Sequence, residues 1–169
     1  SIQSSKIEVG YKAFDGGASI ILSDGMPNIP ANAFNNCSIE DISIPSSVTS
    51  IDKSAFYNCP NLTKINIPAK VSSIGSRAFQ KCYRLTKISI PPSITSIENY
   101  VFSNCFSLKQ IFIPSTVSSI GDFSFAECSN LVEASIPSTL NSIGTNVFEN
   151  CSSLRKIYCL QSIDAIKDY

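Results

Sequence analysis

Apolar and polar positions alternate along this chain in an order that repeats, and the repeat is the clearest feature of the sequence. A cysteine follows each member of a phenylalanine column three residues later, and that column consists of Phe34, Phe56, Phe79, Phe102, Phe125 and Phe148. The interval is 23 residues throughout, except for a first interval of 22. A fixed period of about 20 to 50 residues indicates stacked repeats, because one copy cannot bury its apolar face alone.

Each repeat contains two segments with β propensity and a turn between them. Leu62, Ile65 and Ile67 end in period-2 alternation, which predicts a short strand that pairs in parallel with its equivalents in neighbouring repeats. The Val-x-Ser-Ile segment at 71–74 predicts a second strand on the opposite wall. The spacing of Ala, Phe and Cys between them predicts a single helical or 3₁₀ turn. We therefore expect a solenoid with short parallel strands in each 23-residue repeat, coiled into a β-rich, right-handed, curved superhelix.

One column of each repeat is rich in glycine without being restricted to it. Its members are Pro30, Asp52, Gly75, Glu98, Gly121 and Gly144. Because proline and acidic residues share this position, the backbone there cannot require a positive φ. The column predicts the entry to a turn, with Asp or Gly as the cap.

The repeat template divides the chain into three segments. They are a degenerate N-terminal capping repeat over 1–33, full repeats over 34–159 and a partial C-terminal repeat over 160–169. In the first segment Ile20 aligns with Ile42, and in the last Ile163 and Ile166 match the Val-x-Ser-Ile half of a further repeat. We expect the first segment to cover the apolar end of the stack, as terminal repeats of solenoids do.

The two halves of one repeat resemble a known class. Residues 44–51 (Ile-Pro-Ser-Ser-Val-Thr-Ser-Ile) and 55–65 (Ala-Phe-Tyr-Asn-Cys-Pro-Asn-Leu-Thr-Lys-Ile) are similar to BspA-like leucine-rich repeats, and the likeness extends over about residues 30–160. The resemblance implies a leucine-rich-repeat solenoid. It also implies a cell-surface or secreted binding protein of anaerobic bacteria or parasitic protists, often an adhesin for host matrix proteins or other cells. The family has no catalytic residues to transfer to this chain.

Composition and charge narrow the classes of partner. The chain is 43% hydrophobic and 15% charged, which is typical of an ordered domain with a continuous core. Thirteen basic residues balance thirteen acidic ones, so no net field favours nucleic acid or an anionic membrane. No apolar run approaches the roughly 18 residues that span a bilayer. We expect neither a nucleic-acid partner nor membrane insertion of this segment.

The residues that most enzymes need are missing. The chain has no histidine, which removes the commonest general base and metal ligand. Neither a glycine-rich phosphate loop nor a Cys-x-x-Cys pair occurs. We therefore expect no enzyme activity, no cofactor and no metal site.

Six of the seven cysteines occupy one repeat column, which indicates a structural role. Stacked equivalents would lie about 4.8 Å apart, beyond the preferred Cβ separation of a disulfide of about 3.8 Å. We therefore expect free thiols that pack as small apolar groups, with Cys159 also in the core. Cysteine usage then does not reveal the compartment.

The residues that flank the strand isoleucines should face outward, and they vary among repeats whose inward positions barely change. The candidate partner-binding residues are Lys64, Asn66, Lys87, Ser89, Gln110, Phe112, Glu133 and Tyr158. Lys64 and Lys87 would form a basic stripe with Lys109 nearby, and Phe112 and Tyr158 are aromatics of the kind found at binding hot spots.

These observations predict a non-catalytic protein-binding or adhesion module that uses its exposed strand face. Its expected place is the cell surface or the secreted fraction, and its expected partner is a protein such as a host matrix or cell-surface protein. Two alternatives stay open. The first is an intracellular leucine-rich-repeat scaffold that regulates a partner enzyme, and the second is an idle, solvated sheet.

Overall fold

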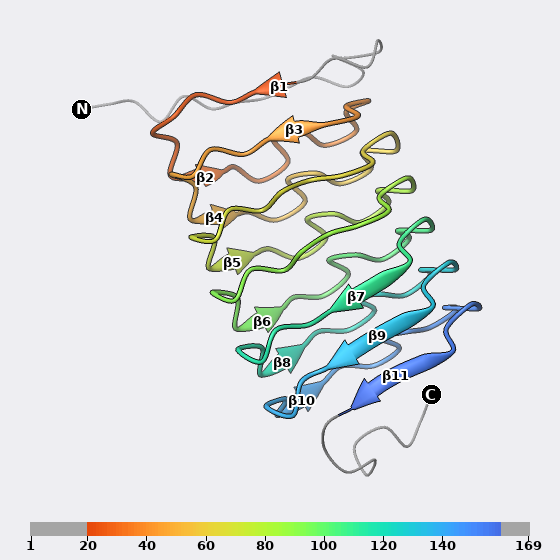
Figure 1. The fold of residues 1–169 in the computed structure, drawn as a ribbon. Helices are drawn as coiled ribbons and strands as arrows, with labels where there is room; N and C mark the ends of the chain where they lie inside the picture. Colours follow the sequence, from red (N-terminus) through yellow and green to blue (C-terminus); the bar gives the residue numbers. More distant parts are fainter. Residues whose placement is uncertain (1–19, 160–169) are drawn as a thin grey trace.

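The protein is a stack of similar coils, seen in a computed structural model that describes residues 20–159. Every coil contributes one short segment to each of two walls, which appear as two rows of arrows in Figure 1. The predicted capping function of 1–33 remains a prediction, since its first 19 residues lie outside the described residues. The predicted partial repeat over 160–169 lies outside them as well.

Wall A carries the strands of the Leu-x-x-Ile-x-Ile segments. They are β1 (Ile20–Ile21), β3 (Ile42–Ser43), β7 (Gln110–Phe112), β9 (Glu133–Ile136) and β11 (Lys156–Cys159). β1 pairs with β3, β9 lies between β7 and β11, and all these pairs are parallel. Isolated parallel bridges, Ser43 with Asn66 and Lys64 with Lys87, link the coils between the two sheets.

Wall B carries the Val-x-Ser-Ile strands. They are β2 (Asn28–Ile29), β4 (Ser50–Ile51), β5 (Ser73–Ile74), β6 (Ser96–Ile97), β8 (Ser119–Ile120) and β10 (Ser142–Ile143). They form two parallel sheets, β2-β4-β5 and β6-β8-β10. Equivalent residues are partners in the strand register, for example Ile51 and Ile74. The predicted parallel stacking of 23-residue repeats is therefore confirmed.

The turn segment differs from the predicted helical turn, because no helix forms within residues 20–159. The N–H groups of Ala55 and Tyr57 close short turns by donating to the carbonyls three residues before them, at 3.2 and 3.1 Å. The intervening N–H groups of Ser54, Phe56 and Asn58 donate instead to carbonyls of the next coil, at 2.8 to 3.0 Å. Three of these five donors thus serve contacts between coils. A helix would have used them along its own axis.

This alternation places two residues of each turn in the left-handed region. Ser54 has a φ of 56° and Asn58 a φ of 53°, and the same two columns repeat the feature along the stack. Asparagine tolerates this conformation, which explains why Asn36, Asn58, Asn104 and Asn150 share one column. The glycine column itself avoids positive φ, as predicted. Glycine there allows close approach, because a Cβ on Gly75 would lie 2.5 Å from the backbone nitrogen of Lys53.

The core is built from columns of identical side chains. The six phenylalanine rings of the repeat column stack with centroids 5.2 to 5.6 Å apart and planes within 14°. The thiols of the cysteine column donate to phenylalanine carbonyls of the preceding coil, as Cys105 does to Phe79 at 3.3 Å. No disulfide joins the seven cysteines of residues 20–159, and six of them are buried, as expected.

Cys159 was expected in the core, but it is only half-buried. It ends β11, and within residues 20–159 this strand has a neighbour on one side only. Among the described residues, no further coil covers the other side of its side chain.

Candidate functional site

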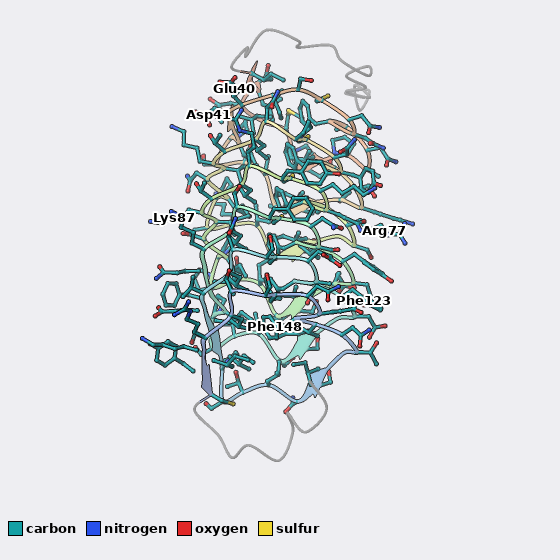
Figure 2. The ribbon with its side chains drawn as sticks, turned by 90° about the vertical axis from the view of Figure 1, so that its right-hand side faces the viewer. Glu40, Asp41, Arg77, Lys87, Phe123 and Phe148 are labelled. Carbon is teal, nitrogen blue, oxygen red and sulfur yellow. The ribbon has the colours of Figure 1, made fainter. Side chains whose placement is uncertain are left out.

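The outward side chains of wall A form two parallel columns, because inward isoleucines alternate with them along each strand. The first outer column holds Asp41, Lys64, Lys87, Gln110, Glu133 and Lys156, and the second holds Ser43, Asn66, Ser89, Phe112, Ser135 and Tyr158. Seven of the eight predicted binding residues are exposed, whereas Glu133 is half-buried. In Figure 2, Asp41 and Lys87 project from this side of the stack and Arg77 projects from the opposite side.

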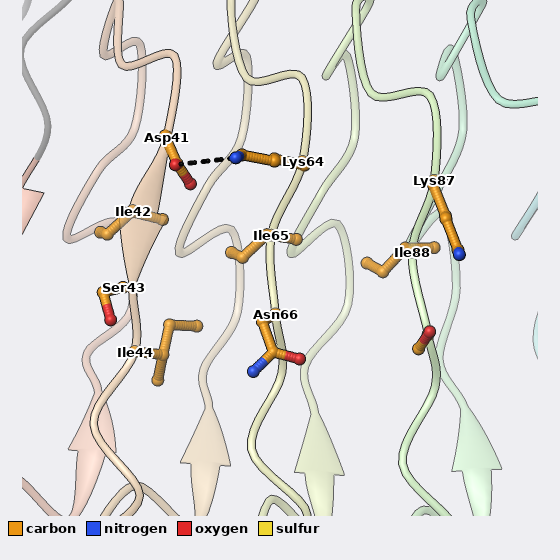
Figure 3. Close-up of a pocket in the computed structure, with 10 residues that line it drawn as sticks. Asp41, Ile42, Ser43, Ile44, Lys64, Ile65, Asn66, Lys87 and Ile88 are labelled. Carbon is orange, nitrogen blue, oxygen red and sulfur yellow. Dashed lines mark ion pairs between the residues drawn. The ribbon is translucent and has the colours of Figure 1, made fainter.

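Charges in the first outer column are partly paired. Lys64 lies 3.4 Å from the carboxylate of Asp41, an ion pair shown in Figure 3. Lys156 donates to Glu133 at 3.3 Å, and Gln110 donates to the other carboxylate oxygen of Glu133 at 3.3 Å. The lysines of the predicted basic stripe therefore differ in their surroundings, because Lys64 forms an ion pair with a carboxylate. Within residues 20–159, Lys87 and Lys109 have none.

Two shallow depressions lie side by side on this wall, and Lys87 lines both. The first, of about 390 Å³, extends over the small residues Ser43, Asn66 and Ser89 (Figure 3). The second, of about 510 Å³, adjoins it and is bordered by Lys87, Lys109, Gln110 and Phe112. The structure thus brings two lysines that have no carboxylate partner among the described residues, together with an aromatic ring, to the edge of one hollow.

The two exposed aromatics occupy one column but not adjacent coils. Phe112 is 63% exposed and Tyr158 is 47% exposed. The strand register places Ser135 between them, opposite both residues.

The hydrogen bond to Glu133 raises the pKa of Lys156, and the nearby Tyr158 raises it further.

Sequence reasoning missed a further aromatic pair at the edge of wall A. Tyr83 and Phe106 stack with centroids 5.0 Å apart, and Phe106 is exposed. Both follow the cysteine column by one residue, so reading that column would have identified them. They lie on the turns that follow the cysteine column, outside the two outer columns.

Two thiols of the cysteine column, Cys37 and Cys105, are poorly suited to nucleophilic chemistry. Burial raises the pKa of Cys105 to about 12, and burial with the neighbouring Cys59 raises that of Cys37 to about 11. A thiol must ionise to act as a nucleophile, so these groups are inert at neutral pH.

Among the described residues, no three Cys, Asp or Glu side chains are grouped to hold a metal ion. Residues 20–159 also contain no helix that is long and apolar enough to cross a bilayer.

Comparison with known proteins identifies the repeat. The model of the BspA type leucine rich repeat region matches six copies, over residues 1–106 and 49–169. No curated protein matches the chain.

Solved structures of bacterial leucine-rich repeat proteins are similar to this fold. The protein from T. pallidum is 29% identical with a TM-score of 0.64, over 82% of this chain and 78% of its own. That from Bacteroides ovatus is 27% identical with a TM-score of 0.59, over 89% of this chain and 58% of its own. A protein from Eubacterium ventriosum shares the fold at 22% identity, with a TM-score of 0.76 over 94% of this chain. The present chain spans only 50% of that protein.

Proposed function

Since the chain belongs to the BspA-type leucine-rich repeat family, we propose that it is a non-catalytic module that binds a protein partner through the outer columns of wall A. Solenoids expose extended faces of this kind, and such faces are their usual binding surfaces. One observation carries the proposal. Lys87 and Lys109, both without a carboxylate partner in residues 20–159, and the exposed Phe112 border the same depression of about 510 Å³.

The contrast between inward and outward positions supports this choice of surface. The inward positions of the wall A strands repeat almost unchanged, since Ile42, Ile65, Ile88 and Ile111 hold one column. The outward positions change in charge and size from coil to coil. Variation over a constant scaffold creates a surface with a defined pattern of charge and shape, which a protein partner can recognise.

We place this module at the cell surface or in the secreted fraction, with a host matrix or cell-surface protein as its partner. This placement follows the resemblance to the BspA-like class. The intracellular scaffold is the alternative. The absence of a disulfide among the cysteines of residues 20–159 allows it without favouring it, because the repeat spacing itself accounts for unbridged cysteines. A secretory leader or an anchor in the full-length gene product would decide in favour of the extracellular role.

The binding test uses a triple variant of wall A. Lys64→Glu and Lys87→Glu reverse two charges, and Phe112→Ala removes the exposed ring. The variant and the wild-type chain are immobilised and used to capture partners from host matrix proteins and from the organism's own lysate. We expect the triple variant to lose the partner that the wild type captures, with an unchanged melting curve.

A matched control carries the same changes elsewhere. Lys53→Glu, Lys70→Glu and Phe106→Ala alter two exposed lysines and one exposed ring outside the outer columns. This control should capture the partner as well as the wild type does. Equal capture by a folded wall A variant would reject the proposed surface.

A further inference from the structure

We propose that the surface above Ser135 is a slot for one aromatic side chain of the protein partner, inserted between Phe112 and Tyr158. The residues next to that side chain would be acidic and would meet Lys87 and Lys109. The inference rests on the proposed function and deepens it, because it names the chemistry of the partner segment.

The solenoid stacks aromatic rings wherever neighbouring coils carry them in one column. Besides the phenylalanine column of the core, Tyr83 stacks on Phe106 and Tyr100 stacks on Phe123, both with centroids 5.0 Å apart. In all of these pairs the planes lie within 14° of each other. The spacing of the coils, about 4.8 Å between paired strands, sets this geometry.

The second outer column breaks that pattern at a single coil. Phe112 on β7 pairs with Ser135 on β9, which pairs with Tyr158 on β11. Two strand spacings, or about 9.6 Å, therefore separate the coils that carry the two rings. A planar ring placed halfway would lie about 4.8 Å from each coil position. This is close to the 5.0 to 5.6 Å at which rings stack elsewhere in this protein.

The slot has a small floor and two exposed sides. Ser135 is half-buried and contributes only a hydroxymethyl group, whereas Phe112 and Tyr158 are 63% and 47% exposed. Insertion of a ring would remove apolar surface of both side chains from water and add two stacking contacts.

The neighbouring polar groups favour an aromatic side chain over a sugar ring. A sugar sandwiched between two rings needs free hydrogen-bonding groups around its edge. Here Gln110 and Lys156 both donate to Glu133, so each of its carboxylate oxygens already has a partner. The three polar side chains beside the slot therefore hydrogen-bond to one another.

The charges near the slot select the sequence around the inserted residue. Lys87 and Lys109 line the depression that Phe112 borders, and neither has a carboxylate partner among the described residues. A segment with Asp or Glu on the Phe112 side of its aromatic residue would place negative charge over these lysines. Charge complementarity of this kind steers association and fixes register.

The first test needs no partner protein, because a substitution in this chain supplies the ring that fills the slot. Ser135→Phe would supply the missing ring on β9 and stack it between Phe112 and Tyr158. We expect the melting temperature to rise by about 2 to 4 °C, because about 1 kcal/mol of added stacking shifts the midpoint by this amount in a chain of this size. The control Ser43→Phe adds a ring to the same column where no aromatic neighbour exists and should not raise the melting temperature. An equal or lower melting temperature for Ser135→Phe than for Ser43→Phe would show that the two rings do not form a slot.

The binding test uses peptides displayed on phage. A library of random 12-residue peptides is selected on the immobilised full chain, and we expect enrichment of peptides with one aromatic residue next to Asp or Glu. The best peptide is then synthesised with Trp at the aromatic position. Because the chain contains no tryptophan, a blue shift of the peptide emission reports burial of that ring directly. We expect affinity to fall at least tenfold for Ser135→Phe and for Phe112→Ala, and to stay unchanged for Phe106→Ala, which removes an exposed ring outside the outer columns.

The outcomes separate this slot from the wider surface. Enriched peptides without an aromatic residue, undiminished binding to Ser135→Phe, or no enrichment at all would each overturn the slot. Preference for an oligosaccharide array over the peptide library would do so too. If Ser135→Phe retains a natural partner that the wall A triple variant loses, the proposed surface stands and the slot alone is wrong.

Discussion

The ring of Phe102 stacks on that of Phe79 with centroids 5.6 Å apart and only 3° between their planes. On its other side Phe102 stacks on Phe125, at 5.4 Å. The four inner phenylalanines of the column are thus each buried against the coils before and after them. The stability of the solenoid depends on these contacts between neighbours.

Removal of a ring from the middle of this column should therefore be costly. Phe102 is fully buried, and we expect Phe102→Ala to lower the free energy of unfolding by about 3 to 5 kcal/mol, through lost burial and the cavity that remains. Urea unfolding monitored by circular dichroism measures the change. Phe112→Ala serves as the control, because that exposed ring should contribute less than about 0.5 kcal/mol. A loss under about 1 kcal/mol for Phe102→Ala would mean that this column is not the core.

Relief of strain in a turn should stabilise the protein. Glu127 has a φ of 63° in the column where Asn104 and Asn150 adopt the same conformation. Its carboxylate accepts a hydrogen bond from Asn150 at 2.6 Å, and an asparagine could accept one too, as Asn36 does from Asn58. We expect Glu127→Asn to raise the free energy of unfolding by about 0.5 to 1 kcal/mol. The reverse change, Asn104→Glu, should lower it, and chemical denaturation of both variants provides the comparison.

The thiols should differ sharply in accessibility. At pH 8, we expect an aromatic disulfide reagent to modify Cys159 first, because the other six thiols are buried. In denaturant all seven should react. Absorbance of the released thiolate counts the modified groups, and Cys159→Ser should abolish the fast phase. Rapid modification of several thiols in that variant would contradict the packed cysteine column.

Stability should fall in alkaline solution. Burial raises the pKa of Cys105 from its ordinary 9.0 to about 12, so the folded state holds this proton more tightly than the unfolded state does. The contribution of this protonated thiol to the free energy of unfolding is fully present below pH 9. It is lost as the pH rises toward 12. Each such group contributes at most about 1.4 kcal/mol per pH unit. Urea midpoints between pH 8 and 11 should decline, and Cys105→Ala should flatten the decline. The same slope in that variant would exclude Cys105 as a source.

The ion pair of Lys64 with Asp41 should matter little for folding. Their side chains are 72% and 45% exposed, and solvent screens such pairs to about 0 to 1 kcal/mol. We expect Lys64→Gln to shift the urea midpoint only marginally, which makes Lys64 suitable for the wall A variant. A large loss of stability would require a contact of Lys64 beyond this ion pair.

The sequence alone was sufficient to predict the stacked repeats, the two walls and the buried columns. Identical spacing of Phe, Cys and Ile can be satisfied only if equivalent residues lie over one another, so period and apolar pattern together specify the solenoid. It also predicted which residues of wall A face outward, because side chains alternate along a strand.

Only the tertiary structure decided how the turns and the surface charges are arranged. The Ala, Phe and Cys spacing fits a helical turn equally well, and contacts between coils divert every second N–H to the next repeat. Arg77, Tyr100 and Phe123 take positive φ although their residue types do not favour it. The partner of Lys64, and the isolation of Lys87, depend on side-chain contacts between coils. A linear pattern specifies which residues are neighbours in the stack, but the contacts they form depend on the three-dimensional packing.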